Sequence, residues 1–442
     1  MGKRVRQAII AAAGLAAAVS SVGLQAGPPS DWSKIPTKSV KLFYPGQSTY
    51  EWLVGPEHKK SAQRKVAEGA ACTSCHVDEE ADIGKLTVSG QRLEPAKLDG
   101  KQPTIDLKVQ AAYDDKNLYW RFEWKTKNNF PGTAYPFYRF DGKEWKKYGQ
   151  PRLDKEAQAG KVPAVYEDRL TIMLDDGKVA RFKEQGCWLT CHDGMRDTAV
   201  EASKAAVKAN PLIGQTLKKT DVRKYLPASR TDANASWDKT KSPEEIAKLK
   251  AAGQFVDLMQ WRAHRSNPVG MADDGYVLEY RLFDEGKNMF SSNLDKEKKQ
   301  PKYMFDAGKV GAKSVTAGKM RDPKGPQTLV PGQTAVPFDP AAGWKEGDLL
   351  PQYYINRADA KGSAADNTDV KGSWGNGAWT VVWARPLDTG HPQDDKILKA
   401  GGVYTLGFAV HDDNITTRGH HVSFPVTLGL GAKADIQAVK TR

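Results

Sequence analysis

The sequence predicts a mainly β fold, an antiparallel β-sandwich with long loops and short helices, preceded by a helical N-terminal segment. Several segments alternate apolar and polar residues with a period of two, as half-buried strands do. Helical patterns are few and short, and long stretches rich in Gly, Pro, Lys and Asp separate the strand candidates. A chain with this pattern favours antiparallel sheets packed face to face.

The first 26 residues have the layout of a secretory signal peptide. Lys3, Arg4 and Arg6 are followed by an apolar run over 8–24, and small residues end the leader at Ala26. The run is rich in alanine and shorter than the about 20 strongly apolar residues of a membrane span. No later segment of the sequence could span a bilayer. We therefore expect cleavage after Ala26 and export to the periplasm, with the extracellular space as the alternative.

The mature chain is expected to have an N-terminal segment over 27–100 and a β-sandwich domain over 101–435. In the first part, good helix formers run from Glu57 to Glu68 and end at Gly69. This helix leads into the first of two cysteine motifs.

The strongest strand signal in the second part is a hairpin. Apolar and polar residues alternate over 105–111 and over 118–124, on either side of the turn Asp114-Asp115-Lys116-Asn117. The alternation predicts one buried face. Further strands are predicted at 169–174, 275–283, 378–384, 403–411 and 421–428.

Short surface helices are predicted at 199–209 and 242–252, the second with Ser242 as its N-cap and Pro243 in its first turn. Long polar stretches remain, and loops of such length are expected to be functional or to contain small elements of their own. Covering a cofactor is one such use. The stretches are 125–165, 193–255 and 286–375.

Cys72-Thr-Ser-Cys75-His76 is a C-x-x-C-H pentapeptide, the pattern of covalent c-type haem attachment. Each thiol can add to a haem vinyl group, and the imidazole of His76 can bind the iron. A redox C-x-x-C of the thioredoxin type is the alternative, but such motifs open a helix after an apolar strand. The residues before Cys72 form no such strand, so haem c is favoured.

Cys187-Trp-Leu-Thr-Cys191-His192 repeats this pattern with one extra residue between the thiols, and the two motifs use all four cysteines. The extra residue leaves a local disulfide or a pair of zinc ligands as alternatives. Zinc usually takes four ligands, from two such pairs brought together. Because the two pairs are more than a hundred residues apart and each has its own histidine, we predict a second haem c with His192 as its axial ligand.

Each motif leaves the sixth iron position to another side chain. His58, on the helix that precedes the first motif, is the predicted second ligand there. The alternative is an exposed helix histidine beside Lys59 and Lys60. Two histidines would set a lower reduction potential than a histidine and a methionine.

Other conspicuous residues receive ordinary structural interpretations. The twelve tryptophans are predicted to be mainly core residues. The pairs Asp273-Asp274 and Asp412-Asp413 could bind calcium, but they lack a loop of regular ligand spacing, so turns are predicted. His411 ends a strand and is predicted to be a structural histidine bonded to Asp412 or Asp413.

The formal net charge is +13, and removal of three basic residues with the leader leaves +10. Basic patches can bind nucleic acid, but an exported chain seldom meets it, so no nucleic-acid partner is expected. Steering toward an acidic redox partner is one interpretation of the charge. A solvated surface without partner preference is the other.

Five strings along the chain together resemble the haem-binding gamma subunit of ethylbenzene dehydrogenase and its relatives among periplasmic molybdenum enzymes of the dimethyl sulfoxide reductase family. Their order along the chain is stronger evidence than any one string. The resemblance implies a β-sandwich of the carbohydrate-binding-module type that holds one haem at the end of its sheets and passes electrons. The strings are AAYDDKNLYWRFEW at 111–124, EDRLTIM at 167–173, VDLMQWR at 256–262, WTVVWARPL at 379–387 and FAVHDDN at 408–414.

The sequence departs from that family in two ways. The simple gamma subunits resemble non-covalent haem b proteins with methionine and lysine as iron ligands, whereas here cysteines tether the cofactor. A segment before residue 100 also adds a second haem. The resemblance is therefore to a multihaem c-type branch.

The resemblance also implies a distal ligand for the second haem. The related subunits place their lysine ligand near the start of the last strand, where Gly419, His420 and His421 lie in this sequence. One of the two histidines is the predicted ligand, with His421 favoured. Met195, Met271 and His264 are the alternatives.

Together these features predict an exported dihaem c-type cytochrome that passes electrons between redox partner proteins, such as a molybdenum enzyme or another cytochrome. One alternative is a haem-carrying subunit of a periplasmic molybdenum oxidoreductase. Another is a haem enzyme with one open iron site, and a third is a carbohydrate-binding or adhesive module. No catalytic turnover of its own is expected, and the sequence leaves the oligomeric state open.

Overall fold

The computed structural model describes residues 27–91, 93–128, 130–150, 154–196, 200–322, 325–412 and 419–441. The predicted signal peptide, residues 1–26, lies outside these residues. Within them, no helix is long and apolar enough to cross a membrane.

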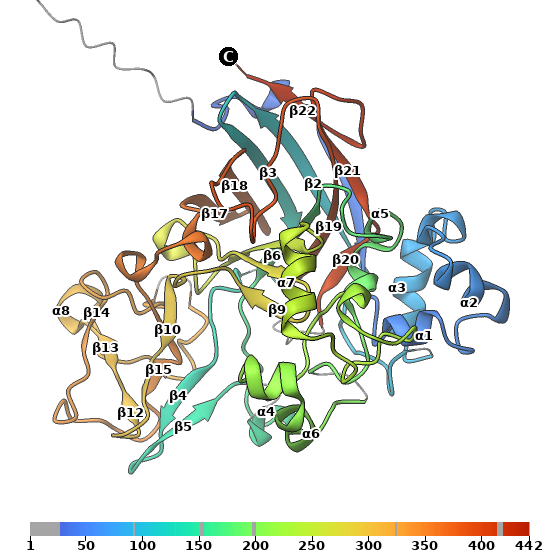
Figure 1. The fold of residues 1–442 in the computed structure, drawn as a ribbon. Coiled ribbons are helices and arrows are strands. Elements are labelled where there is room, and N and C mark those ends of the chain that lie inside the picture. Colours follow the sequence, from blue (N-terminus) through green and yellow to red (C-terminus); the bar gives the residue numbers. More distant parts are fainter. Residues whose placement is uncertain are drawn as a thin grey trace, which may run out of the picture.

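A large sheet organises the fold (Figure 1), and neighbours along its main path are antiparallel. In spatial order this path runs through β17 (Asp369–Gly375), β18 (Ala378–Pro386), β3 (Asn117–Lys125), β2 (Thr104–Tyr113), β1 (Lys38–Phe43), β20 (His421–Ser423), β19 (Val403–His411), β6 (Arg169–Asp175), β7 (Val256–Arg262), β8 (Gly275–Val277) and β9 (Arg281–Phe283).

The sheet folds back on itself as a sandwich, which confirms the predicted fold class. Trp124 of β3 packs against Trp261 of β7 at a ring-centroid distance of 5.9 Å, although five strands separate β3 from β7 along the sheet. Phe122 of β3 meets Phe408 of β19 at 5.8 Å in the same way. At the sandwich edge, β21 (Val426–Leu430) pairs with β19, and β22 (Ile436–Lys440) joins β21 to β2 in parallel.

The predicted hairpin forms this core as expected. Leu118, Trp120, Phe122 and Trp124 of β3 are all buried in one apolar cluster with the inward residues of β2 and β19. The prediction that tryptophans are core residues also holds for the four fully buried tryptophans in the sandwich, Trp124, Trp261, Trp379 and Trp383.

Two predicted strands are divided in the structure. The run 275–283 splits into β8 and β9, because Leu278 turns out of the sheet and its carbonyl accepts hydrogen bonds from Leu226 N and Ser229 Oγ. The run 421–428 is interrupted between β20 and β21 at Pro425, which has no N–H to donate. The predicted turn at Asp273-Asp274 is also wrong, since Asp273 pairs with Gln260 of β7 in an antiparallel bridge.

The helical predictions hold with shifted ends. The helix before the first motif is α2 (Lys60–Ala67), and Gly69 after it has φ +92°. Ser242 caps α7 (Pro243–Ala251) through a reciprocal hydrogen-bond pair with Glu245. The run predicted at 199–209 is helical only over α6 (Lys204–Ala209), and Ala199 lies outside the described residues.

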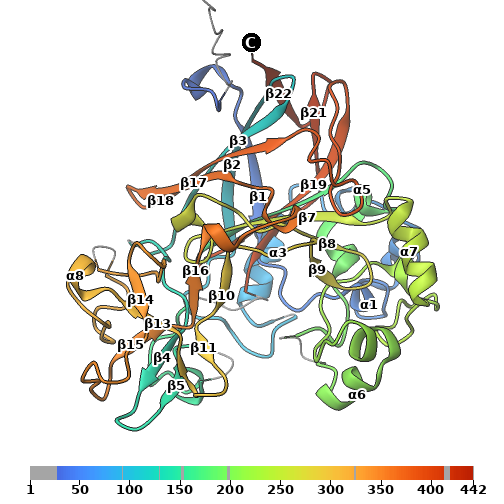
Figure 2. The same cartoon turned by 60° about the vertical axis from the view of Figure 1, so that its left-hand side comes forward.

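Strands β1, β7 and β17 lie where the sequence predicts no strand, and the polar stretch 286–375 contains several short strands. That stretch and part of 125–165 form a lobe of small sheets with its own apolar core beside the sandwich (Figure 2). Its strands are β4 (Phe137–Phe140), β5 (Trp145–Tyr148), β10 (Phe290–Ser292), β11 (Leu294–Asp295), β12 (Gln300–Pro301), β13 (Tyr303–Phe305), β14 (Ala335–Pro337), β15 (Leu349–Pro351) and β16 (Tyr353–Ile355).

The remaining helices are short, namely α1 (Tyr50–Leu53), α3 (Glu80–Val88), α4 (Lys155–Gln158), α5 (Phe182–Gln185) and α8 (Ala307–Val310). Helices α1, α2 and α3 lie together at one side of the sandwich, next to β20 (Figure 1). The segment 27–100 therefore contributes both these helices and strand β1 of the main sheet.

Replacing Phe122 with alanine removes a fully buried ring between the two layers. We expect the free energy of unfolding to fall by about 3–5 kcal/mol, as for other buried aromatic truncations. Denaturant unfolding measures this loss. The control Lys125→Ala, at an exposed position of the same strand, should change stability by less than about 0.5 kcal/mol. Equal effects of the two variants would contradict the sandwich core.

Candidate functional site

The first cysteine motif is a tight turn after α2. Residues Cys72–Ser74 form one turn of 3-10 helix, and the backbone N–H groups of Cys75 and His76 both donate to Cys72 O. Burial raises the pKa of the Cys72 thiol to about 11. Redox C-x-x-C motifs depend on a lowered thiol pKa, so this environment does not favour thioredoxin-type chemistry.

The structure brings His58 and His76 close together, and the role of His58 as an iron ligand stays a prediction. Their ring centroids lie 6.0 Å apart with 23° between the ring planes. Two imidazoles on opposite sides of one metal ion, each about 2 Å from it, have ring centres roughly 6 Å apart. The observed spacing therefore matches that of two axial ligands.

A hydrogen bond at Nδ1 orients each of the two imidazole rings. His58 Nδ1 donates to Leu53 O at 2.9 Å, and His76 Nδ1 donates to the carboxylate of Glu79 at 2.8 Å. Because both acceptors lack a proton, Nδ1 carries the hydrogen in each neutral ring. Such partners fix the tautomer that leaves Nε2 to bind a metal.

The second motif follows α5 as a buried turn, the 3-10 segment Gly186–Thr190. Cys187 is 5% exposed, and burial raises its pKa to about 11. Lys224 Nζ donates to Cys191 Sγ at 2.9 Å. A Cβ added at Gly407 of β19 would lie 2.8 Å from Cys187 Sγ. A residue with a side chain at position 407 would therefore collide with this sulfur.

His192 lies behind the two cysteines and is fully buried. Its Nδ1 donates to Oε1 of Glu51 on α1 at 2.9 Å, and its ring stacks on Tyr225 at 3.8 Å. Burial lowers the pKa of His192, so the ring is neutral near pH 7. Its Nε2 has a long 3.3 Å contact with Leu189 O. Glu51, which sequence reasoning missed, thus plays the orienting role for His192 that Glu79 plays for His76.

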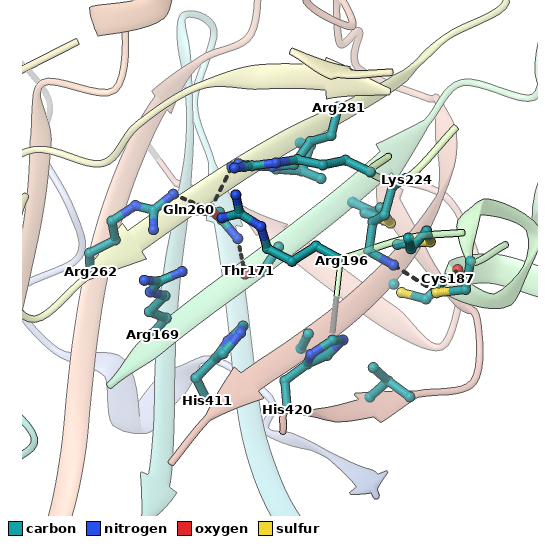
Figure 3. A pocket seen from close by; sticks show the side chains of 18 of the residues that line it. Arg169, Thr171, Cys187, Arg196, Lys224, Gln260, Arg262, Arg281, His411 and His420 are labelled. Atoms are coloured by element: carbon teal, nitrogen blue, oxygen red, sulfur yellow. Dashed lines mark hydrogen bonds between the residues drawn. The ribbon is translucent and has the colours of Figure 1, made fainter. Parts of the chain in front are cut away.

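A cleft of about 290 Å³ opens on the outer face of the sandwich layer formed by β19, β6 and β7 (Figure 3). Alternation along each strand supplies its floor, because one set of side chains points into the core and the other points outward. Cys187 and Cys191 both line the cleft. The floor residues are Met173, Thr171, Leu258, Gln260, Gly407 and Ala409.

The end of the cleft opposite Cys187 is strongly basic. Figure 3 shows Arg169 and Arg262 at that end. Arg169 is four residues along β6 from Met173, which pairs with Gly407, so the cleft extends about 13 Å along the strand from the thiols. The basic side chains that line the cleft are Arg169, Arg196, Arg223, Lys224, Arg262, Arg265 and Arg281.

These seven basic side chains outnumber the carboxylates that pair with them. In the described part of the chain they pair with three carboxylates, Glu167, Asp221 and Asp273, which leaves a surplus of four positive charges. Burial and the neighbouring Arg262 lower the pKa of Arg281 to about 9. A half-buried surplus of this kind favours an anionic ligand.

Of the predicted distal pair, His420 lines the cleft and His421 does not. Successive residues of a strand face opposite sides, so only one of the two can point into the cleft. His420 stacks on His411 at 4.9 Å. His421 is fully buried on the other side, where its Nε2 donates to Gln102 O at 2.8 Å. Burial, with nearby Lys101, lowers the pKa of His421 to about 3.

The other residues proposed as the distal ligand of the second haem differ in whether they line the cleft. Met195 lines it, and its sulfur accepts a hydrogen bond from His192 N at 3.0 Å. Met271 is buried in a separate apolar cluster with Val269 and Ile355. His264 is buried outside the cleft lining, with Nδ1 donating to Thr133 O.

Among the described residues no carboxylate accepts a hydrogen bond from the buried Nδ1 of His411. The carboxylate of Asp412 accepts a hydrogen bond from Lys127 N, and Asp413 lies outside the described residues. His411 lines the cleft beside His420.

An aromatic cluster joins the two motifs in space. Phe424 lies 6.5 Å from the His76 ring and 5.4 Å from the ring of Trp188, which stands between Cys187 and Cys191. Phe43 completes the cluster, and Cys72 packs against it. Motifs that are more than a hundred residues apart in the sequence therefore contact the same few side chains.

Comparison with known proteins agrees with this architecture. A family model described as ethylbenzene dehydrogenase matches residues 30–423. The chain belongs to the ethylbenzene dehydrogenase family. Cytochrome c-552 of Stutzerimonas stutzeri is 28% identical over 433 residues, which are 97% of each chain. Cytochrome c-551 of Rhodocyclus tenuis is 28% identical over 170 residues, 38% of this chain and 56% of that protein.

Membership of the ethylbenzene dehydrogenase family confirms the resemblance read from the five strings, and the multihaem form stays a prediction. Two of those strings contain Arg169 and Arg262 of the basic end. Sequence reasoning used them only as family markers. The period-two pattern around Arg169 could have shown that this arginine faces away from the apolar side of its strand.

The buried neutral imidazole of His264 should make stability depend on pH. Burial lowers its pKa to about 4, below the 6.5 of an unfolded chain. The unfolded state then binds a proton that the folded state does not, so the contribution is complete above pH 6.5 and is lost as pH falls toward 4. We expect a loss of about 3 kcal/mol across this window. The variant His264→Asn keeps a donor to Thr133 O and should lose less on acidification in denaturant unfolding. An unchanged pH profile would contradict this assignment.

Proposed function

We propose that the chain is an exported dihaem cytochrome c that carries electrons between redox partner proteins. Its relatives named cytochrome c-552 and cytochrome c-551 support a haem electron-transfer role. The observation that carries the proposal is the cleft. It combines two thiols, an apolar floor and a surplus of basic side chains, with Arg169 and Arg262 at the end opposite the thiols.

This combination suits the second haem c. Cys187 and Cys191 would hold its vinyl side, and the apolar residues of β6, β7 and β19 would contact the porphyrin. The arginines would pair with the propionates, because bidentate guanidinium groups bind carboxylates well. His192 lies outside the described lining of the cleft, so its Nε2 would have to leave Leu189 O and turn toward the cleft to supply the axial nitrogen, with Glu51 holding its Nδ1 proton.

Of the predicted distal pair we favour His420 over His421, because His420 lines the cleft. For the first haem, Cys72 and Cys75 would provide the thioethers, with His76 and His58 as axial ligands. The segment 27–100 would then be the haem-one segment, and 101–435 the haem-two domain. Haem iron that alternates between two oxidation states supplies the electron-carrying chemistry in each site.

The cluster of Phe43, Trp188 and Phe424 supports exchange between the two sites. Phe424 lies next to both the ring of His76 and the ring of Trp188, the residue that follows Cys187. The basic net charge supports an acidic docking partner. A molybdenum enzyme and another cytochrome remain the two candidate partner classes.

The count of covalent haems tests the proposal. Intact mass and a pyridine haemochrome assay on the exported protein should show two haems per chain. The double variant Cys72→Ala/Cys75→Ala should lose the first, and Cys187→Ala/Cys191→Ala should lose the second. A native mass with one haem, or a disulfide between Cys187 and Cys191, would overturn the dihaem assignment.

The adjacent residues His420 and His421 form a matched pair for the distal ligand. We expect His420→Ala to open one iron site, so that carbon monoxide shifts the spectrum of the reduced protein. His421→Ala should keep the spectrum of six-coordinate iron, because His421 faces Gln102 rather than the cleft. Carbon monoxide binding by His421→Ala alone would reverse the assignment. Binding by the unaltered protein would instead favour the haem enzyme with an open site.

A further inference from the structure

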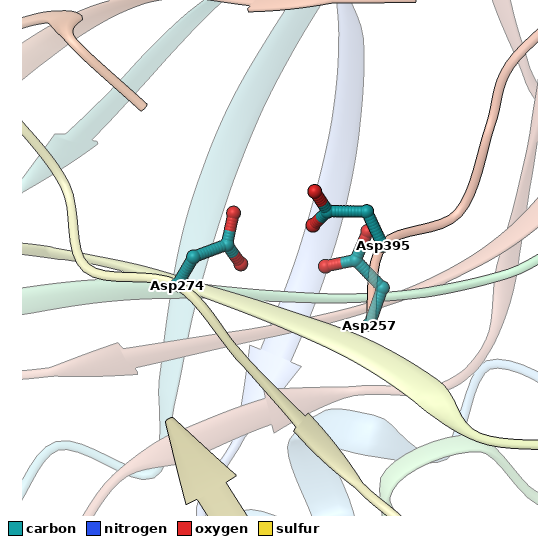
Figure 4. Close-up of side chains that lie close together, drawn as sticks. All are labelled: Asp257, Asp274 and Asp395. Atoms are coloured by element: carbon teal, nitrogen blue, oxygen red, sulfur yellow. The ribbon is translucent and has the colours of Figure 1, made fainter. Parts of the chain in front are cut away.

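Five buried aspartates form an aspartate cluster on the other side of β7 from the cleft. They come from β7, the start of β8, the end of β9 and the loop between β18 and β19, and each is at most 5% exposed. Figure 4 shows three of them with their carboxylates gathered together. The members are Asp257, Asp274, Asp284, Asp394 and Asp395.

The carboxylate oxygens form two groups that share one residue. Oxygens of Asp257, Asp274 and Asp395 all lie within 4.8 Å of one another, and so do oxygens of Asp284, Asp394 and Asp395. Asp395 therefore stands between two positions, each surrounded by three carboxylates.

The positive charge around the cluster is insufficient. Among the described residues, Arg385 is the basic side chain paired with it, at 2.8 Å from Asp257 and 3.8 Å from Asp395. Lys396 is directed to Asp175 and Asp176 instead. Five carboxylates and one guanidinium leave four negative charges, and burying unpaired charge is strongly unfavourable.

Several oxygens of the cluster also lack a hydrogen-bond donor in the described structure. They are both carboxylate oxygens of Asp284, Oδ1 of Asp257 and Oδ1 of Asp394. Others are satisfied, since Asp394 Oδ2 accepts from Ser363 Oγ and Glu285 N. Buried polar atoms are nearly always partnered, so the unpartnered oxygens favour a ligand that carries positive charge.

The electrostatics agree with this arrangement. Burial, followed by the neighbouring Asp395 and Asp257, raises the pKa of Asp284 to about 10. Burial, against the opposing effect of Arg385, raises the pKa of Asp257 to about 7. Both shifts express the cost of ionised carboxylates without a counter-charge.

We propose that the aspartate cluster binds calcium at two positions bridged by Asp395, with Asp284 and Asp394 on one side and Asp257 and Asp274 on the other. Two divalent cations balance the four excess charges. The donors are all oxygens, which favours hard cations over zinc or copper. Calcium accepts several carboxylates at 2.3–2.6 Å, whereas magnesium usually keeps its waters and takes one or two carboxylates.

Bound calcium would fasten the edge of the sandwich. The ligands join β7, β8, β9 and the loop 387–402, and the same strands carry Arg262 and Arg281 of the cleft. The site needs no haem for its chemistry, so this proposal and the proposed function can fail separately.

The test uses the full holoprotein, treated with a chelator, reloaded with calcium chloride and passed through gel filtration. Elemental analysis should find two calcium ions per chain, and the chelator should lower the Tm by roughly 3 °C or more relative to calcium in hundredfold excess over its Kd. Titration calorimetry should show a higher affinity for calcium than for magnesium. Absence of retained calcium together with an unchanged Tm would overturn the proposal and show that the carboxylates hold protons instead.

Two variants sharpen the result. Asp395→Asn should abolish calcium retention and, because it removes an uncompensated buried charge, should raise the Tm of the chelator-treated protein above that of the unaltered protein. The haem spectrum monitors its folding. The matched control is Asp388→Asn, an exposed aspartate in the same loop, which should retain calcium normally. Calcium retention by Asp395→Asn equal to that of the control would overturn the site.

Discussion

The structure depends on one layer of the sandwich, β19, β6 and β7, having two buried faces. The side-chain alternation of a strand sends Leu170, Ile172 and Leu174 of β6 into the core. The residues between them, such as Arg169 and Met173, face the cleft. A single layer thus provides both the stability of the sandwich and the floor of the candidate site, and any change in register would exchange the two sets of side chains.

In strand β7 the alternation of side chains places negative and positive groups on opposite faces of the sheet. Asp257 points toward the inner side at one end of the strand, and Arg262 points outward at the other. Each belongs to a buried cluster of like charge, four negative charges in excess on one side and four positive on the other. The two clusters lie on opposite faces of the sheet and so cannot neutralise each other. Each therefore calls for its own ligand, cationic on one face and anionic on the other.

The two cysteine motifs show a second effect of the fold, which is that residues far apart in the sequence lie close together. Helix α1 holds Glu51 against His192, while Tyr50 N donates to Cys191 O. The N-terminal segment is thereby fixed to the second motif as well as carrying the first. An electron carrier with two sites benefits from such docking, because the separation of the sites is then set by packed side chains rather than by a linker.

Much of this protein was determined by its sequence. Local patterns predicted the hairpin, β6, β18, β19, α2 and α7, since alternation and capping act over a few residues. Likewise, Cys72, Cys75 and His76 form a recognisable motif because covalent attachment needs those side chains within one turn. The closeness of His58 and His76 follows from the chain itself, since one short helix separates them.

Only the tertiary structure decided which distant groups meet. Nothing local relates Glu51 to His192, Gly407 to Cys187, or Asp274 to Asp395, because each pair is joined by sheet packing across more than a hundred residues. The orientation of His420 and His421 was decided in the same way. Both residues have the same chemistry, and the strand that carries them determines which one faces the cleft.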